Sequence, residues 1–315
     1  MENQEESVNF LAQILKTTYD SDANPNVVYP LLQLNLDKLN EDFAQILKKW
    51  AIHSLPKMLA SDSSYWGWSL ISFATLLIDF PMGNRASNIE IAIAASEGAL
   101  LVYEENTINW AGVHSGLGRA YRNRIYGDSR QNLKKAIDFY HNALAFYTKQ
   151  KNSLLPQWAD VQMNLGVAYA HLLDGDRKKN LEQAIKCLDT ASIVYSNELK
   201  LPEKWAHSQY NLGRFYDDLI SICDNVQERA ENWEMQIEHY NNALQIITEF
   251  NNPQQWAHAQ WQLGKAYGYR IKGNSAENLK MAIACHNNAL RFFNREEYPE
   301  QWASLQNNLS RILKR

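Results

Sequence analysis

The amino-acid sequence predicts an all-helical protein in which similar pairs of helices follow one another along the chain. The first observation is an internal repeat, with copies that begin at Trp66, Trp110, Trp158, Trp205 and Trp256 and a half copy that begins at Trp302. The unit is therefore roughly 44 to 51 residues long. Within a copy, apolar residues recur at helical spacing in two stretches. Gly and Pro are sparse and regularly placed, which is typical of helices separated by short turns.

The first stretch of each copy predicts one helix, as the copy that begins at Trp158 shows. Its apolar face consists of Trp158, Leu165, Tyr169 and Leu172. Gly166 lies beside this face, where the missing side chain would let a neighbouring helix come close. We expect the helix to end near Gly175, in the position of a left-handed C-cap.

The second stretch predicts a helix that packs on the first. Asn180 is a suitable N-cap, with Gln183 three residues later as in a capping box. The apolar stripe consists of Leu181, Ala184, Ile185, Leu188 and Ala191. Its isoleucine recurs as Ile93, Ile137, Ile237 and Ile283, and its last alanine as Ala99, Ala143, Ala243 and Ala289. Large and small residues repeated in register indicate helix pairs that interlock as they stack.

At these residues the chain resembles the tetratricopeptide repeat (TPR) family. The family signature has Leu-Gly-x-x-Tyr in the first helix, then Ala, a bulky residue and Ala in the second. The first part is matched by Leu117-Gly118 with Tyr121, Leu165-Gly166 with Tyr169, Leu212-Gly213 with Tyr216, and Leu263-Gly264 with Tyr267. The second part is matched by Ala136, Tyr140 and Ala143, and by Ala184, Leu188 and Ala191. The resemblance implies a right-handed α-solenoid of antiparallel helix pairs.

The repeat departs from the family in its length and at one position. The family period is about 34 residues, and the copies here are longer. Where the family has a Trp, this chain has Gln162, Gln209, Gln260 and Gln306, and its own Trp lies one turn upstream. This long variant resembles repeats of many cyanobacterial proteins, which often precede a caspase-like CHAT protease domain. The stretch from Asn24 to Ala51 resembles the leader of such proteins.

We expect two regions along the chain. Residues 1–60 should form an N-terminal helical cap, and residues 61–315 the repeat array, with units that start near residues 66, 110, 158, 205 and 256 and a half unit from 302. In the half unit, the apolar stripe consists of Trp302, Leu305, Leu309 and Ile312. We expect this last helix to lie on the preceding pair as a lid. A half copy would equally fit a chain that continues into a further segment.

Composition limits the classes of function. The chain has 31 Lys and Arg residues against 35 Asp and Glu residues, which are interspersed and argue against an extended nucleic-acid surface. Three widely spaced cysteines argue against a disulfide framework. The N-terminus is acidic and polar, unlike a signal peptide, and the longest apolar run, Leu70 to Ile78, is too short to span a bilayer. We therefore expect a cytoplasmic protein with neither nucleic acid nor membrane as partner.

No pattern in the sequence predicts a catalytic, cofactor or metal site, and we expect the protein not to be an enzyme. HExxH, paired CxxC, GxGxxG and Walker motifs are absent from the sequence. Cys285 and His286 are adjacent, so on a helix they point about 100° apart and do not suit a nucleophile and its base. We expect the acids Asp217 and Asp218 to be solvated. The recurrent tryptophans are expected in the core rather than on a carbohydrate or nucleic-acid platform.

The resemblance also implies a groove for a partner, because the first helices of the family line a concave face. The matching residues are Arg119, Arg122, Asn123, His171, His207, Tyr210, Arg214, His258, Trp261, Lys265 and Tyr269, with Asp160, Met163 and Asp218 among them. Such cationic and aromatic residues are enriched at binding hot spots. Trp261 replaces Ser115, Met163 and Tyr210 of other copies, so packing alone does not require a Trp. The cations predict a partner with an acidic segment, and the alternative is an ordinary solvated surface.

The leading functional hypothesis is a non-catalytic scaffold that binds a peptide, helix or protein in this groove. The alternative is the sensor or regulatory portion of a CHAT-type caspase-like protease system, acting in cis or in trans. A reading frame that continued past Arg315 into a domain with a His and Cys dyad would favour that alternative. A third hypothesis, an RNA or nucleotide binder, is disfavoured by the net charge of −4 and the lack of a motif.

Overall fold

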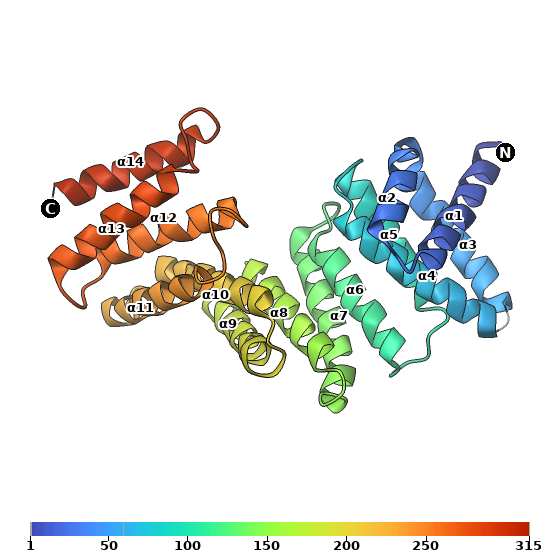
Figure 1. The fold of residues 1–315 in the computed structure, drawn as a ribbon. Coiled ribbons are helices and arrows are strands. Elements are labelled where there is room, and N and C mark those ends of the chain that lie inside the picture. Colours follow the sequence, from blue (N-terminus) through green and yellow to red (C-terminus); the bar gives the residue numbers. More distant parts are fainter. Residues whose placement is uncertain (1, 59, 315) are drawn as a thin grey trace. The chain divides into compact units, whose positions relative to one another are not determined.

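The computed structural model describes residues 2–58 and 60–314, and in this part of the chain every regular element is a helix (Figure 1). The predicted all-helical class is confirmed for these residues. Contacts group the chain into two compact units, one up to Ala168 and one from Tyr169 onward. The boundary lies within α8 (Leu155–His171). The predicted division near residue 60 stays a prediction.

The first unit holds the N-terminal helices and two complete helix pairs. Its elements are α1 (Glu2–Asp20), α2 (Pro25–Gln33), η1 (Leu36–Lys38), α3 (Glu41–Ser54), η2 (Leu55–Lys57), α4 (Ala60–Asp79), α5 (Arg85–Ala99), α6 (Ile108–Arg122) and α7 (Ser129–Lys149), followed by the start of α8. Helix α4 packs on α5, and α6 packs on α7. Helices α1 and α3 lie on α4 and α5 respectively, so the N-terminal helices cover the first pair.

In the second unit, each helix packs on the one that follows it in the chain. Its elements are α9 (Arg177–Ile193), the single π-turn η3 (Val194–Glu198), α10 (Pro202–Ile222), α11 (Val226–Ala243), α12 (Pro253–Tyr269), α13 (Ser275–Leu290) and α14 (Pro299–Leu313). Helices α10 and α11 form one pair, and α12 and α13 the next. Helix α14 lies on α12 and α13 with Leu305, Leu309 and Ile312 buried, which confirms the expected packing of the last helix.

The recurrent tryptophans lie near the start of their helices, Trp66 in the second turn and the others in the first, but they are not all core residues. Trp158 is 6% exposed, and its indole N–H donates to the Thr148 hydroxyl at 3.1 Å. The other five, Trp66, Trp110, Trp205, Trp256 and Trp302, are only partly buried. The expectation of core tryptophans is therefore correct for Trp158 and too strong for these five.

The repeated glycines set the distance between the two helices of a pair. A Cβ atom on Gly118 would lie 2.6 Å from the Tyr140 ring, and one on Gly264 would lie 2.5 Å from the His286 ring. Gly213 is in the same relation to Tyr240, at 2.9 Å. Such approaches are far inside van der Waals contact. The expected role of the glycine is confirmed in these three pairs, where the ring comes from the second helix of the same pair.

The turn inside four of the pairs follows one pattern, which differs from the predicted one. A glycine with positive φ precedes an Asn or Asp that caps the second helix, as in Gly83-Asn84, Gly127-Asp128, Gly175-Asp176 and Gly273-Asn274. The predicted N-cap at Asn180, its capping box with Gln183 and the C-cap at Gly175 are therefore wrong. Helix α8 already ends at His171, and the Asp176 carboxylate accepts from the Lys179 N–H at 3.1 Å.

Asn180 instead closes the turn from inside the helix. Its Nδ2 donates to the carbonyls of Leu172 and Asp174 at 3.0 and 2.8 Å. The same turn hydrogen bond joins Asn88 to Met82, Asn132 to Tyr126, and Asn278 to Lys272. The asparagine satisfies a carbonyl that the chain reversal would leave without a partner.

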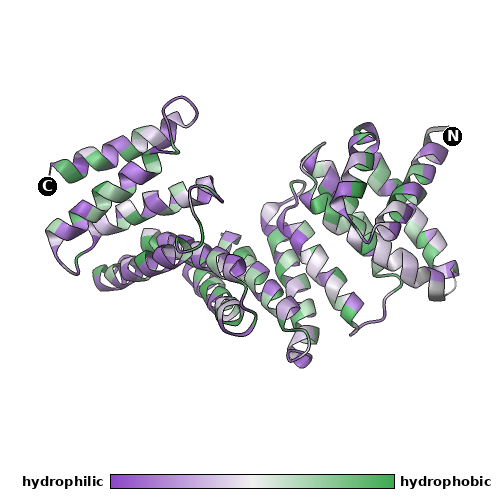
Figure 2. Cartoon of the chain, viewed as in Figure 1, coloured by the Kyte–Doolittle hydropathy of each residue, from purple (hydrophilic) through white to green (hydrophobic). Residues whose placement is uncertain are grey.

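Polar and apolar residues alternate around most helices, and the apolar ones face neighbouring helices (Figure 2). A cluster in the second unit contains Ile237, Tyr240, Ala243 and Leu263, all buried, with Trp205 and Trp256 packed against it. Among the described residues, no helix combines the length and the apolar character that crossing a membrane requires.

Candidate functional site

Helices α10 and α12 are the first helices of adjacent pairs in the second unit, and they contact each other. They carry seven of the predicted groove residues: His207, Tyr210, Arg214, His258, Trp261, Lys265 and Tyr269. These seven residues, with Asp217 of α10, are called the α10/α12 surface below.

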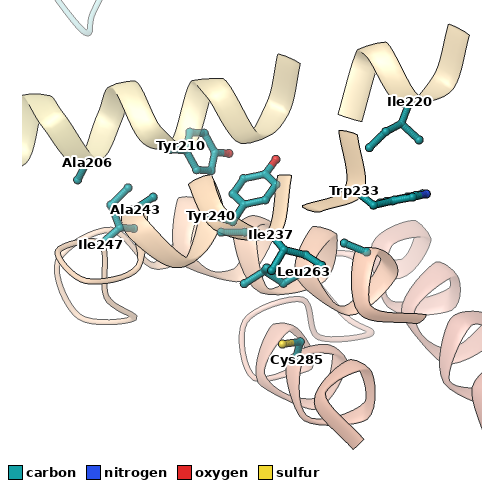
Figure 3. Close-up of a cluster of buried hydrophobic side chains, with 12 residues drawn as sticks. Ala206, Tyr210, Ile220, Trp233, Ile237, Tyr240, Ala243, Ile247, Leu263 and Cys285 are labelled. Carbon is teal, nitrogen blue, oxygen red and sulfur yellow. The ribbon is translucent and has the colours of Figure 1, made fainter. Parts of the chain in front are cut away.

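Tyr210 belongs to the core rather than to an open groove. It is 8% exposed, and its ring meets the edge of the Tyr240 ring at a centroid distance of 5.9 Å (Figure 3). Gly213 leaves the space that the Tyr240 ring occupies. The Tyr210 hydroxyl lies 3.1 Å from Nδ1 of His258, and this contact ties α10 to α12. The prediction that Tyr210 faces a partner is therefore wrong for its ring.

His258 is a neutral hydrogen-bonding group at neutral pH. Burial lowers its pKa to about 4, and the positive charge of Arg214 acts in the same direction. Its Nε2 lies 3.4 Å from the Gln262 amide nitrogen. His258 therefore adds no positive charge to this surface.

One of the two Lys and Arg residues of this surface is paired with an acid of the same unit. Lys265 Nζ lies 2.7 Å from Asp217, and the two side chains are only 36% and 22% exposed. The adjacent Asp218 pairs with Arg177 at 2.7 Å, and burial raises the pKa of its carboxyl. The expectation that Asp217 and Asp218 are merely solvated is therefore wrong. Two neighbouring acids on one helix point to different cations of the adjacent elements.

Arg214 differs from these cations. It lies on α10, one turn after Tyr210, and it is exposed. It forms no ion pair with any residue that the structure describes. Its positive charge acts to lower the pKa of Tyr210, His258 and Asp218, so Arg214 lies near these three residues.

Two aromatic residues of the surface are held in place by packing. Trp261 is partly buried and meets the Phe293 ring edge-on at 5.8 Å, so packing accounts for part of its presence. Tyr269 is 41% exposed and stacks on Trp233 at 5.7 Å with an interplanar angle of 18°. Its hydroxyl accepts a hydrogen bond from Arg311 at 2.9 Å. Both rings are therefore oriented before any partner arrives.

The remaining predicted groove residues lie on α6 and at the end of α8. Arg119 donates to Asp79 at 2.9 Å and to the Thr75 carbonyl at 3.1 Å. Its positive charge is therefore paired with an acid of the first unit. Asn123 is the C-cap of α6 and donates to the Arg119 carbonyl. Arg122 is partly buried, and His171 is the exposed last residue of α8.

A buried polar cluster in the second unit was not predicted. The Gln209 side-chain oxygen lies 2.7 Å from His239 Nδ1 and accepts from the Asn242 amide at 3.2 Å, and the Gln209 amide donates to Ser192 at 2.8 Å. The hydrogen bond from Asn242 to Gln209 has an equivalent in the next pair, where the Asn288 amide donates to the Gln260 side-chain oxygen at 3.3 Å. The sequence signal was the glutamine that replaces the family tryptophan, with an asparagine in the second helix.

The described residues offer little for catalysis or metal binding. No group of three or more His, Cys, Asp or Glu side chains among them is arranged to hold a metal ion. Burial raises the pKa of the Cys187 and Cys285 thiols to about 11. Both thiols are therefore protonated at neutral pH, whereas a reactive cysteine needs a thiolate.

No model of a known protein family matches the chain, and no curated protein matches it. We therefore infer its function from the geometry of the α10/α12 surface.

Proposed function

We propose that the protein is a non-catalytic interaction scaffold, a right-handed TPR-like solenoid, that binds a peptide, helix or protein partner on the α10/α12 surface. The observation that carries the proposal is Arg214, which is exposed and forms no ion pair with a described residue, on the surface that also carries Trp261 and Tyr269, whose rings packing already orients. Arg, Trp and Tyr are the residues most enriched at binding hot spots. Rings that are fixed in advance lose less conformational entropy when a partner binds.

The same surface favours a partner with a carboxylate next to an apolar side chain. Lys265 is neutralised by Asp217, so Arg214 is the cation that remains for a partner's acid. Tyr269 offers an exposed ring for the apolar contact. The expected partner therefore has a short acidic segment with an aromatic or aliphatic residue, rather than a long run of acids.

The test is a pull-down from the source organism, followed by affinity measurements on the captured partner. Arg214→Ala is expected to weaken binding by about 2 kcal/mol or more if it is a central anchor. The matched control is Lys280→Ala, which removes the same charge from an exposed position of α13. Equal affinities of both variants would contradict a role for Arg214.

A double variant tests the whole surface. Arg214→Ala with Trp261→Ala removes the cation and one ring, and its thermal unfolding must be followed because Trp261 contacts Phe293. Unchanged affinity in a double variant that still unfolds cooperatively would place the binding face elsewhere. Regulation of a CHAT-type protease and a cytoplasmic location stay predictions.

A further inference from the structure

A cleft in the first unit is lined by none of the predicted site residues, although Arg122 and Asn123 lie between two of its lining residues in the chain. It has a volume of about 500 Å³ and is formed by α3, α5, the end of α6 and the turn after α6. This volume is within the range of about 300–1,000 Å³ typical of ligand pockets. The polar side chains that matter below are Glu41, Lys48, Glu90, Glu97, Tyr121 and Arg124.

The charges of the cleft are unequal, with three carboxylates against two cations. Arg124 holds Glu90 with two hydrogen bonds, of 2.6 and 2.8 Å, and both side chains are at most one quarter exposed. Lys48 pairs with Glu97 through one contact of 2.8 Å, and the Lys48 side chain is 50% exposed. The Lys48–Glu97 pair is therefore the weaker and more exposed of the two, and Glu41, which is hydrogen-bonded to Tyr126, is the carboxylate in excess.

The Lys48–Glu97 pair can open at little cost. Exposed ion pairs of this kind contribute about 0–1 kcal/mol, because water and salt screen them. The Arg124–Glu90 pair has the planar, two-bond geometry that is much harder to replace. An incoming cation would therefore displace Lys48 and leave Arg124 in place.

The aromatic ring at the cleft already has its own partners. Tyr121 lines the cleft and is buried, with the Arg124 guanidinium at 5.5 Å and Lys135 Nζ at 5.2 Å from its ring centroid, and its ring stacks on Phe139. Tyr121 therefore helps to hold Arg124 in place. What the cleft offers an incoming guanidinium is a carboxylate, with which a guanidinium forms two parallel hydrogen bonds that an ammonium cannot form.

We propose that this cleft binds an arginine side chain of a partner protein, whose guanidinium takes the place of Lys48 on Glu97. Glu41 supplies a second carboxylate in the same cleft. The acidic excess makes the cleft complementary to a cation, and the apolar walls of Ala44 and Ile93 suit the arginine methylenes. The proposal concerns the first unit and does not depend on the α10/α12 surface.

Two variants that break the same ion pair test it, because they should act in opposite directions. Lys48→Ala removes the competitor of the guanidinium, and Glu97→Gln removes its acceptor. The probe is the blocked peptide acetyl-Ala-Ala-Arg-Ala-Ala-amide, titrated calorimetrically into the full chain at low salt. We expect binding to tighten several-fold in Lys48→Ala and to weaken about tenfold or more in Glu97→Gln, since a lost charge-assisted bond costs about 1.5–3 kcal/mol.

Controls separate this effect from general electrostatics. Lys49→Ala removes the same charge from the next residue of α3, which does not line the cleft, and should change binding less than Lys48→Ala. A peptide with citrulline in place of arginine should not bind. Free L-arginine is a further probe: binding of the peptide alone supports a protein partner, and equal binding of both supports the guanidinium site with a small-molecule ligand. Equal binding of the citrulline peptide, or weaker binding in Lys48→Ala, would overturn the proposal.

Discussion

At the scale of single residues, one missing side chain decides how a helix pair closes. Gly118, Gly213 and Gly264 occupy the same repeat position, and each lies against a ring from the second helix. The ring is Tyr140 or Tyr240 in two pairs and His286 in the third. The identity of the ring can vary because the only requirement is space. Without a side chain at the glycine, any planar ring can pack directly on the helix backbone.

Gly118→Ala and Gly116→Ala should change stability in opposite directions, although they lie two residues apart on α6. The new Cβ at residue 118 would meet the Tyr140 ring at 2.6 Å, which should destabilise the fold by about 1–3 kcal/mol. At residue 116 nothing lies within 4 Å, so alanine should stabilise the helix by up to about 1 kcal/mol. Urea unfolding of both variants measures this. A destabilised Gly116→Ala, or a neutral Gly118→Ala, would contradict the packing described.

At the scale of elements, the turn inside a helix pair is built by the same three residues in four of the pairs. A glycine with positive φ reverses the chain, an Asx side chain caps the next helix, and an asparagine four positions later donates back to the turn. In the pair of α10 and α11 this asparagine is replaced by Arg229, whose guanidinium donates to the Cys223 carbonyl. The turn between α10 and α11 therefore keeps a hydrogen bond from this position to a turn carbonyl, although the side chain and the loop length differ.

Asn132→Ala should lower the stability of the first unit. It removes the hydrogen bond of 2.8 Å to the Tyr126 carbonyl and leaves that acceptor without its donor, which costs about 1–3 kcal/mol. Gln131→Ala is the control, because Gln131 is adjacent and exposed. Unfolding midpoints of the two variants in urea make the comparison. A loss in Asn132→Ala no larger than in the control would show that the turn does not need this bond.

Three histidines should make the second unit acid-sensitive. Burial lowers the pKa of His239, His258 and His286 to about 4, and each lies on a different helix. In the unfolded chain their pKa is about 6.5, so between these values the unfolded state binds more protons. Stability should therefore be complete above about pH 6.5 and fall as the pH drops towards 4, by up to about 1.4 kcal/mol per pH unit for each histidine.

Urea unfolding at pH 7.5 and pH 5.5 measures this loss. His239→Gln should flatten the dependence, because a glutamine stays neutral and can still donate to Gln209. His207→Gln is the control at an exposed position of α10. NMR titration of the imidazoles gives a direct check: pKa values near 6.5 for the buried three would contradict the prediction.

At the scale of the whole molecule, the chain consists of two compact units that meet within α8. Each helix of the second unit packs mainly on its neighbours in the chain. The free energy of unfolding of such an arrangement is approximately the sum of contributions from single repeats and from contacts between neighbours. A destabilising substitution should therefore affect only the neighbouring helices.

Leu263→Ala should therefore loosen the second unit and spare the first. Leu263 is 2% exposed within the core cluster of the second unit, and its truncation should cost about 2–5 kcal/mol. Hydrogen exchange is expected to accelerate in α10 to α13 and to remain unchanged in α3 to α6. The mirror variant Leu117→Ala, in α6, should give the opposite pattern. Acceleration throughout the chain in both variants would show that the two units unfold together.

Much of the fold could be predicted from the sequence alone because the same pattern of apolar residues and glycines recurs in several copies of the repeat. The apolar spacing predicted the helices, and the role predicted for Gly166, to admit a close neighbour, is seen at its repeat equivalent Gly213, which the Tyr240 ring approaches. The start of α9 was misplaced because Asn180 and Asp176 are both good N-caps, and only the hydrogen bonds of the folded turn distinguish them.

The candidate site was predicted less well, because its properties depend on residues far apart in the chain. Tyr210 and His258 were both named from their repeat positions, but their contact and the burial that neutralises His258 arise only when α10 and α12 come together. From the sequence, Lys265 looks like a free cation. In the structure it is paired with Asp217, which precedes it by 48 residues and lies 2.7 Å away. The sequence by itself determined the helices and their repeat, since these depend on local spacing. The tertiary structure decided which charges are paired and which, like Arg214, remain exposed, because electrostatic interactions depend on distance in space and on burial.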